Sequence, residues 1–374
     1  MSTTTIRVGT ASPATGPTTT ATLTQLAGLA RRAAGHGMDL LVLPEAYLGG
    51  YPRGTSFGCV VGERTAQGRD EFARYFDAAV DLGDTVGNGA GAGARWLRRE
   101  LGDGGDAVRG DGTREALEAI AADTGVFLVA GCVEKAGGSL YCAAVYVCPR
   151  EGVIGKRRKV MPTGTERLVW AQGCPSTLRA VSTTIRGTRV NLAAAICWES
   201  YMPLLRQSLY AQNINLYLAP TADGRDAWLG LMRTIAVEGR CFVVSSNMCV
   251  ARDAQPSTTT TAKPRRKSVV IDDDGNEIVL CRQQVDTDAD SAVDARPTTA
   301  AKDFVSRGGS CIVSPFGDVL AGPQWEDSHG LICADIDMRD CIRGRLDMDT
   351  AGSYSRNDAF QLTVQGLDMD PLPY

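Results

Sequence analysis

Histidine is nearly absent from this chain of 374 residues, which contains only His36 and His329. The twelve cysteines include no Cys-X-X-Cys pair. Common structural zinc sites need four cysteine or histidine ligands, usually with two of them closely spaced, so such a site cannot be assembled from neighbouring residues of this sequence. We therefore predict that the protein binds no metal.

The chain also lacks the marks of a membrane, secreted or nucleic-acid-binding protein. No apolar run approaches the roughly 18 residues needed to cross a bilayer, and the first residues lack the basic start and apolar stretch of a secretory signal. The net charge is -4, whereas nucleic-acid binding needs an extended basic surface. We expect a cytoplasmic protein that binds neither membrane nor nucleic acid and keeps its cysteines reduced, most of them buried in strands.

Strand and helix patterns alternate along the chain, which is typical of an α/β fold. Residues 7–12 alternate as in a strand, residues 22–34 repeat apolar positions at helical spacing, and residues 40–43 form a continuous apolar run. Further helices are predicted at residues 71–80, 114–122, 203–213 and 227–240, and further strands at 126–133, 140–148, 190–196, 216–219, 241–247, 309–316 and 331–336. The strands at 126–133 and 140–148 flank a Gly-Gly turn, which favours an antiparallel hairpin.

The strand and helix signals are spread over the whole length, which favours one layered domain over two. We predict a single domain over residues 1–345, followed by a C-terminal tail at 346–374 with little periodicity. Two stretches interrupt the domain. The Gly-rich residues 83–112 predict a surface insertion with little core, and the Thr-, Asp- and Pro-rich residues 254–303 predict a long mobile loop.

Two apolar strands lead directly into residues that can react. One ends in Leu-Pro before Glu45, and the other ends in Ala-Ala-Ala-Ile before Cys197. Open α/β sheets place their ligands at the carboxyl ends of strands. Lys159 ends a basic run and is followed by apolar residues, so we expect it at the edge of buried structure. The rest of that run, residues 156–158, is expected to be mostly solvated charge.

A carboxylate, an ammonium and a thiol in one partly buried pocket make a nucleophilic site without histidine. The lysine charge lowers the thiol pKa, and the carboxylate can take the thiol proton. The same lysine can face negative charge that develops on a substrate heteroatom. Glu45, Lys159 and Cys197 are therefore candidate catalytic residues.

The motifs around these residues resemble those of the nitrilase branch of the nitrilase, or carbon-nitrogen hydrolase, superfamily. Glu45 stands in Leu-Pro-Glu-Ala-Tyr-Leu-Gly-Gly-Tyr-Pro, Lys159 in Arg-Lys-Val-Met-Pro-Thr and Cys197 in Cys-Trp-Glu. The resemblance covers nearly the whole chain. Further similarity lies at residues 165–167, 219–223, 307–311 and 354–360.

This resemblance implies a four-layer αββα sandwich without a cofactor, assembled into homodimers and often into larger spiral oligomers. It implies that Cys197 attacks a nitrile carbon, that Glu45 is the proton acceptor, and that Lys159 stabilises the charge on nitrogen. Water would then convert the thioimidate, through a thioester, to a carboxylic acid and ammonia, with some amide as a by-product. Glu166 matches an additional glutamate of the family that would orient Lys159 or help to position water.

Other functions on the same scaffold are an amidase, a carbamoylase or a cyanide hydratase, and a non-catalytic scaffold protein is an alternative from another class. Cys-Trp-Glu and Met-Pro-Thr favour a nitrilase, and the intact triad argues against the scaffold protein. Residues 201–206 resemble fungal enzymes that act on arylacetonitriles, which indicates an aromatic or arylaliphatic nitrile. Tyr51, Trp170 and Trp198 are predicted to line the substrate pocket, with core packing as the alternative for each.

Overall fold

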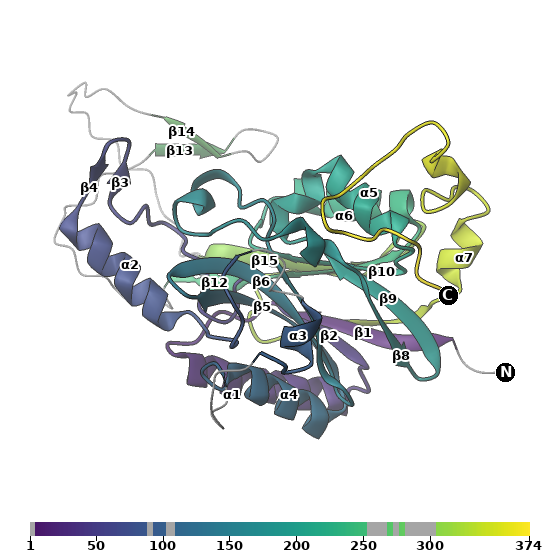
Figure 1. Cartoon of the computed structure of the whole chain (residues 1–374), viewed down its shortest axis with the longest axis horizontal. Helices are drawn as coiled ribbons and strands as arrows, with labels where there is room; N and C mark the ends of the chain where they lie inside the picture. The colour runs from purple at the N-terminus through teal and green to yellow at the C-terminus, as the bar shows by residue number, and fades with distance from the viewer. Residues whose placement is uncertain (1–3, 88–92, 102–108, 253–267, 272–276, 281–303) are drawn as a thin grey trace, which may run out of the picture.

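The computed structural model (Figure 1) describes residues 4–87, 93–101, 109–252, 268–271, 277–280 and 304–374. Two sheets form its centre. The first has the strand order β17 (Leu331–Asp337), β1 (Thr5–Ala11), β2 (Leu40–Val42), β5 (Phe127–Ala136), β6 (Ser139–Cys148) and β7 (Gly152–Arg158). The second has the order β12 (Cys249–Ala251), β15 (Phe304–Val313), β11 (Phe242–Asn247), β10 (Leu216–Thr221), β9 (Thr188–Ala194) and β8 (Val181–Ile185), with β16 (Val319–Trp325) paired to β15.

Helices cover the outer face of each sheet. α1 (Thr19–Gly35) and α4 (Thr113–Thr124) lie together along the first sheet, and α5 (Pro203–Ala211) and α6 (Ala227–Gly239) cover the second (Figure 1). Short elements complete the described fold: α2 (Ala66–Ala78), α3 (Ala94–Leu97), α7 (Asp340–Gly344), β3 (Cys59–Val60) and β4 (Glu63–Arg64). The order helix, sheet, sheet, helix confirms the predicted αββα sandwich.

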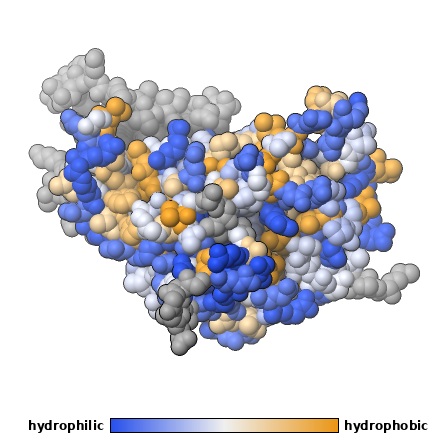
Figure 2. All heavy atoms as spheres, viewed as in Figure 1, coloured by the Kyte–Doolittle hydropathy of each residue, from blue (hydrophilic) through white to orange (hydrophobic). Residues whose placement is uncertain are grey.

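Alternation of apolar side chains explains why the two sheets stack. Leu40 and Val42 of β2 point into the core between the sheets, whereas Leu41 points towards α1 and α4. In β10, Leu216 likewise faces the core between the sheets and Tyr217 faces α5 and α6. Both sides of each central strand are therefore buried, as in sheets covered on both faces. On the face shown in Figure 2, hydrophilic and hydrophobic residues are interspersed.

Local signals set several element ends near their predicted positions. The side chain of Thr18 caps α1 by accepting a hydrogen bond from the Ala21 amide at 3.1 Å. Pro203 begins α5, where its missing N–H costs nothing. The predicted hairpin is confirmed, because β5 and β6 pair antiparallel up to Ala136 and Ser139 around Gly137, which has a φ of 55°.

The structure differs from the sequence predictions in several places. The strands β3, β4, β7, β8, β12 and β16 were not predicted, and β16 lies between the strands predicted at 309–316 and 331–336. The stretch at 83–112 was expected to have little core, but Asp84 and Trp96 are buried in it. Within the loop predicted at 254–303, β13 (Ser268–Ile271) and β14 (Glu277–Leu280) form an antiparallel pair. The rest of that prediction lies outside the described residues.

Cysteine placement follows the prediction in most positions. Cys132, Cys142, Cys148, Cys241 and Cys311 are buried, whereas Cys333, also expected in the core, is only half-buried in β17. All of the cysteines in the described ranges are free thiols. No described helix is both long and apolar enough to cross a membrane.

Candidate active site

Three strands deliver the candidate catalytic residues to one place. Glu45 follows β2, Lys159 follows β7 and Cys197 follows β9. The first two strands run in the same direction, because β7 pairs antiparallel to β6 and β6 antiparallel to β5, which is parallel to β2. Their carboxyl ends therefore share one edge of the first sheet, and β9 brings Cys197 from the second sheet.

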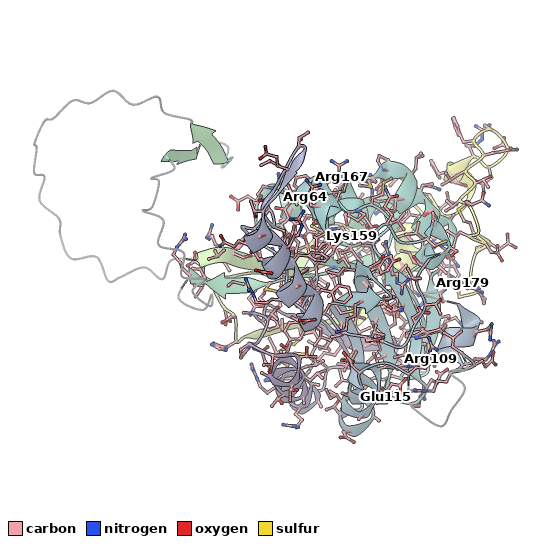
Figure 3. All side chains as sticks on the ribbon, turned by 60° about the vertical axis from the view of Figure 1, so that its left-hand side comes forward. Arg64, Arg109, Glu115, Lys159, Arg167 and Arg179 are labelled. Carbon is pink, nitrogen blue, oxygen red and sulfur yellow. The ribbon has the colours of Figure 1, made fainter. Side chains whose placement is uncertain are left out.

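A buried ion cluster forms where these strand ends meet. Lys159 Nζ lies 2.7 Å from Glu45 Oε1 and 2.8 Å from Glu166 Oε2. One ligand atom each of Glu45, Glu166 and Cys197 lie within 4.8 Å of one another. All four side chains are nearly inaccessible, with exposed fractions of 1%, 0%, 6% and 4% for Glu45, Lys159, Glu166 and Cys197. Figure 3 shows Lys159 in the interior among the labelled residues.

Cys197 occupies a sharp turn between β9 and the 3₁₀ helix η4 (Cys197–Tyr201). Its φ of 54° lies in the left-handed region, which costs a residue with a Cβ about 1–2 kcal/mol. Such strain persists only where the surrounding structure enforces it, and it is common at functional sites. Here the turn directs the thiol back into the buried cluster, where Thr221 Oγ1 lies 3.2 Å from Sγ and donates to it.

The two oxygens of Glu45 have different surroundings. Oε1 accepts hydrogen bonds from Lys159 and, at 3.5 Å, from the thiol of Cys142. Within the described part of the chain, Oε2 has no hydrogen-bond partner. Because a buried carboxylate oxygen normally has one, this atom is suited to receive a proton.

Burial raises the pKa of the Cys197 thiol, and the negative charge of Glu45 raises it further. Lys159 lowers the thiol pKa, as the sequence argument expected, but its effect is smaller than that of burial. The balance of these effects is a raised thiol pKa. The resting nucleophile is a thiol, and it needs a base at the moment of attack.

Burial also raises the pKa of Glu45, although the charge of Lys159 opposes the rise. A carboxylate with a raised pKa is a stronger base at neutral pH, which suits a proton acceptor. For Lys159, burial acts to lower the pKa, but the charges of Glu45, Cys197 and their neighbours outweigh it and the pKa is raised. Lys159 therefore stays an ammonium.

The carboxylates and thiol of this cluster have the spacing of metal ligands, but they do not fit a metal site. Lys159 Nζ is within hydrogen-bond distance of both Glu45 and Glu166. A divalent ion held by the same oxygens would meet this ammonium at short range, where like charges repel strongly. The cluster's counter-charge is the lysine itself.

The carbon-nitrogen hydrolase model matches residues 6–345. This chain belongs to the carbon-nitrogen hydrolase family. The resemblance seen in the sequence motifs is therefore confirmed.

Curated relatives and solved structures agree with this family. The chain is 37% identical to an arylacetonitrilase of Trametes versicolor, covering 88% of this chain and 86% of that one. It is 38% identical to an aliphatic nitrilase of Sinorhizobium fredii, covering 92% and 90%. An amidase of Nesterenkonia from the nitrilase superfamily matches 96% of this chain and 98% of its own with a TM-score of 0.56 at 17% identity, which shows a shared fold.

Tyr51, Trp170 and Trp198 occupy different positions around this hydrolase cluster. Tyr51 donates its hydroxyl to Glu166 Oε1 at 2.9 Å. Trp170 is buried, packs edge-to-face on Tyr51 and donates its indole N–H to Tyr75. Its ring centroid is 5.5 Å from Lys159 Nζ. Trp170 therefore packs in the core, with its ring next to the Lys159 ammonium.

Trp198 lies on the solvent side, with 39% of its surface exposed. Its indole N–H donates to Asp223 Oδ2 at 2.9 Å, and Arg225, which pairs with the same carboxylate, stacks over its ring at 4.7 Å. Tyr201 packs edge-to-face against it and is 40% exposed. Trp198 follows the buried Cys197 directly in the chain, so this exposed aromatic pair lies close to the nucleophile.

Sequence reasoning was wrong about the basic run. Lys156, Arg157 and Arg158 are each 1% exposed and do not form a solvated surface. Each contacts a buried carboxylate: Lys156 and Arg158 pair with Glu134, and Arg157 pairs with Glu199. Partners so distant in the sequence give no local signal.

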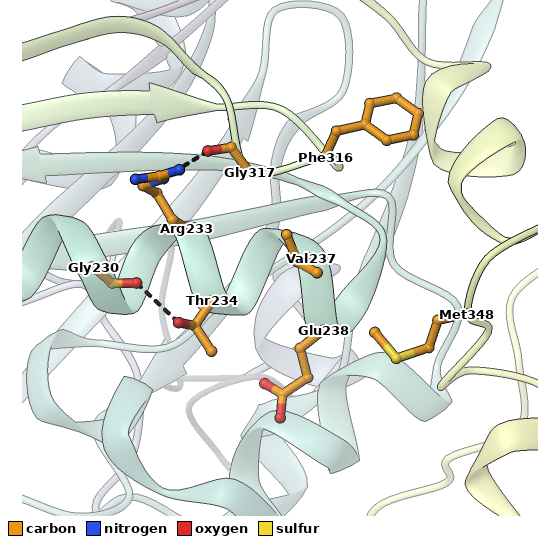
Figure 4. Close-up of a pocket in the computed structure, with 8 residues that line it drawn as sticks. All are labelled: Gly230, Arg233, Thr234, Val237, Glu238, Phe316, Gly317 and Met348. Atoms are coloured by element: carbon orange, nitrogen blue, oxygen red, sulfur yellow. Dashed lines mark hydrogen bonds between the residues drawn. The ribbon is translucent and has the colours of Figure 1, made fainter.

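Two cavities in the described part of the chain lie away from this cluster. One of about 550 Å³ opens on the outer side of α6 (Figure 4), where Arg233 Nε donates to the Gly317 carbonyl at 2.8 Å. The other is lined by C-terminal residues, including Phe360 and Leu367. Neither includes a candidate site residue, and the chemistry of Cys197 carries more weight than cavity size.

Proposed function

We propose that this chain is a nitrilase that hydrolyses an organic nitrile to a carboxylic acid and ammonia. The observation that carries the proposal is the buried Cys197 thiol beside a carboxylate whose pKa is raised and an ammonium whose charge is retained. The relatives named arylacetonitrilase and aliphatic nitrilase support it.

The proposed mechanism assigns one step to each group. Glu45 takes the thiol proton as Cys197 sulfur bonds to the nitrile carbon, and Lys159 faces the nitrogen where negative charge develops. Glu45 then returns that proton to the nitrogen, which gives a thioimidate and restores the carboxylate. Water adds to the thioimidate carbon, ammonia leaves, and a thioester remains. A second water, deprotonated by Glu45, releases the acid and restores the thiol.

Glu166 would act in this mechanism by holding Lys159. Its Oε2 accepts from Lys159 and from the Thr163 amide at 2.7 Å, while Oε1 accepts from Tyr51. If the tetrahedral adduct expels sulfur before ammonia, the product is an amide. The orientation of Lys159 towards the substrate nitrogen would influence that partition, and some amide by-product is expected.

We further propose an aromatic or arylaliphatic nitrile as substrate. Trp198 and Tyr201 offer half-exposed ring faces and edges beside the nucleophile, and aromatic groups pack well in such arrangements. Sequence identity does not distinguish an aromatic from an aliphatic substrate, because the chain is 37% identical to the arylacetonitrilase and 38% identical to the aliphatic nitrilase.

The remaining sequence predictions stand as part of this proposal. Residues 1–345 form one domain with a C-terminal tail at 346–374, the enzyme works in the cytoplasm as a homodimer or larger spiral homo-oligomer, and it needs no cofactor. The match of the family model to residues 6–345 supports the domain boundary.

To test the proposed function, the purified protein is incubated with phenylacetonitrile, benzonitrile, an aliphatic nitrile, cyanide and phenylacetamide. The ammonia, acid and amide that form are then measured. We expect acid and ammonia from the aromatic nitriles, no turnover by Cys197→Ala, and normal turnover by Cys311→Ala, which removes a buried thiol of β15. Hydrolysis of the amide alone, or conversion of cyanide alone, would move the reaction to another member of the superfamily. Turnover that survives Cys197→Ala would refute the mechanism.

A further inference from the structure

Glu199 is a fully buried carboxylate that the proposed mechanism does not use. Its Oε1 accepts from Arg157 at 2.7 Å and from the backbone amides of Val160 and Met161 at 2.6 and 3.2 Å. Its Oε2 accepts from the backbone amide of Ile196 at 2.8 Å. All four hydrogen bonds to Glu199 in the described structure come from N–H donors, and one of these donors is a guanidinium. Such surroundings stabilise a charged carboxylate.

The backbone groups that Glu199 holds belong to two distant segments of the chain. Val160 and Met161 directly follow Lys159, and Ile196 directly precedes Cys197. One carboxylate therefore joins the end of the first sheet's β7 to the turn that ends the second sheet's β9. Lys159 directly precedes the amides that Glu199 binds on β7's side, and Cys197 directly follows the Ile196 amide that it binds on β9's side. We call this set of contacts the Glu199 bridge.

Arg157 strengthens the same bridge from β7. Besides pairing with Glu199, it donates to the Ala194 carbonyl at the end of β9 at 2.6 Å. Arg157 is 1% exposed, and its guanidinium offers several donors in a fixed plane, which favours simultaneous contacts. The cation and the carboxylate thus connect the same two strand ends.

We propose that Glu199, together with Arg157, is a positioning residue that sets the placement of the Lys159 ammonium relative to the Cys197 sulfur. The proposal rests on the proposed roles of Lys159 and Cys197. Glu199 touches neither the substrate nor the thiol. Glu199 acts by holding the backbone next to Lys159 and next to Cys197, including the left-handed turn at Cys197.

Glu199→Gln tests the bridge with little change in volume. The amide oxygen of glutamine can keep the three donors at the Oε1 position, but its NH₂ then meets the Ile196 N–H, donor against donor. The link to the nucleophile turn is lost while the link to β7 is kept. Misplacement of a catalytic group by about 1 Å can lower a rate by 10²-fold.

The matched control is Glu118→Gln. Glu118 also binds β7, through the Val153 amide at 3.1 Å, and also pairs with arginines, Arg99 at 2.7 Å and Arg114 at 3.1 Å. It lies at the opposite end of β7 from Lys159. The two variants therefore change the same functional group against the same strand, and only one changes the connection to Cys197.

Steady-state kinetics on the favoured nitrile, normalised to folded protein, gives the readout. We expect kcat of Glu199→Gln to fall at least tenfold with KM within about twofold and with the pH at the acid midpoint unchanged, because Glu45 is untouched. Glu118→Gln should keep kcat. A kcat for Glu199→Gln within threefold of the parent, or an equal loss in both variants, would overturn the inference.

Arg157→Lys is the second variant, and it decides the matter if Glu199→Gln does not fold. It keeps the positive charge but cannot span Glu199 and the Ala194 carbonyl together, so we expect a smaller fall in kcat, at least threefold, at unchanged KM. An unchanged kcat would contradict the inference. Absence of nitrile turnover by the parent protein would instead refute the proposed function, so the two failures are distinguishable.

Discussion

Single residues in the cluster owe their chemistry to burial. The same loss of water raises the pKa of Cys197 and of Glu45, so neither is ionised as readily as it would be in solvent. Proton transfer from the thiol to Glu45 exchanges one buried negative charge for another, so it adds no net charge to the cluster. Lys159 remains positively charged beside both groups, so negative charge is stabilised most at the positions close to its ammonium.

A pH dependence follows from the raised pKa of Glu45. Protonated Glu45 cannot accept the thiol proton, so kcat/KM should fall as the pH drops through this raised pKa, with a midpoint above about 4.3, the ordinary value for glutamate. The profile of kcat/KM against pH, with folding followed by circular dichroism, checks this. A midpoint at or below the ordinary value, in protein that is still folded, would contradict it.

Tyr51→Phe isolates the support of Glu166. The change removes the hydroxyl that donates to Glu166 Oε1, and a buried carboxylate oxygen left short of a donor costs about 1–3 kcal/mol. We expect kcat/KM to fall by about tenfold, which corresponds to about 1.4 kcal/mol. Tyr47→Phe is the control, because the Tyr47 hydroxyl is buried but binds Gln25 at 2.7 Å on α1. It should lower stability and leave kcat/KM unchanged.

At the scale of elements, β7 and the residue that follows it show how four consecutive cations are accommodated. Successive side chains of a strand point to opposite faces. Lys156 and Arg158 therefore point together towards Glu134, whereas Arg157 and Lys159 point towards Glu199 and the catalytic cluster. The alternation separates a structural ion network from a functional one within a single strand.

A stability prediction belongs to the structural side of β7. Lys156→Met removes the cation that lies 2.9 Å from Asp84 and also contacts Glu134. Leaving buried carboxylates short of a partner typically costs about 3–5 kcal/mol, which urea unfolding measures. Lys135 of β5 is the control, because its ammonium makes only a 3.4 Å hydrogen bond to the Asp77 carbonyl and a 5.9 Å contact with the Phe76 ring among the described residues. Lys135→Met should cost less than about 1 kcal/mol. Equal losses in both variants would argue against the buried network.

The sequence predicted elements where the signal is local. The apolar run of β2, the Gly-Gly hairpin of β5 and β6, and the strand before Cys197 follow from periodicity and turn residues. β7 was missed because its cations look like surface charge until Glu134 and Glu199 are placed beside them. Because Glu199 belongs to Cys-Trp-Glu, the sequence predicts either a place near the nucleophile or a hydrogen bond to neighbouring backbone. The sequence could not identify the two strand ends that Glu199 joins. Residue types at the strand ends predicted Glu45, Lys159 and Cys197 as catalytic residues. The distances between these residues could be obtained only from the fold.

At the scale of the whole molecule, the site exists because two sheets pack face to face. Glu45 and Lys159 come from the first sheet, and Cys197 and Thr221 come from the second. A sheet alone would hold only part of the cluster. Any change that shifts one sheet against the other therefore alters the distance between base, cation and nucleophile, even when it lies far from them.

The C-terminal residues offer a test of that dependence. Val364, Leu367 and Leu372 pack against the core between the second sheet and its helices. The chain is also fastened there by backbone and side-chain bonds, with Leu372 N donating to the Gln212 carbonyl at 3.1 Å and Asn213 Nδ2 donating to the Leu372 carbonyl at 2.6 Å. These contacts hold the C-terminal residues against the end of α5, because Gln212 and Asn213 directly follow that helix.

Deletion of residues 364–374 should therefore destabilise the second sheet's outer layer without touching the cluster. Three partly buried apolar side chains contribute roughly 2–4 kcal/mol, so urea unfolding should shift by that amount, measured at two protein concentrations so that assembly is not mistaken for folding. Asp368→Ala, which changes an exposed side chain in the same segment, should leave the midpoint unchanged. We expect kcat of the folded truncated protein to stay within about threefold of the parent, because the truncation leaves the Glu199 bridge between the two sheets intact. A large loss of kcat without a loss of stability would mean that the C-terminal segment, and not the packed sheets alone, determines the geometry of the cluster.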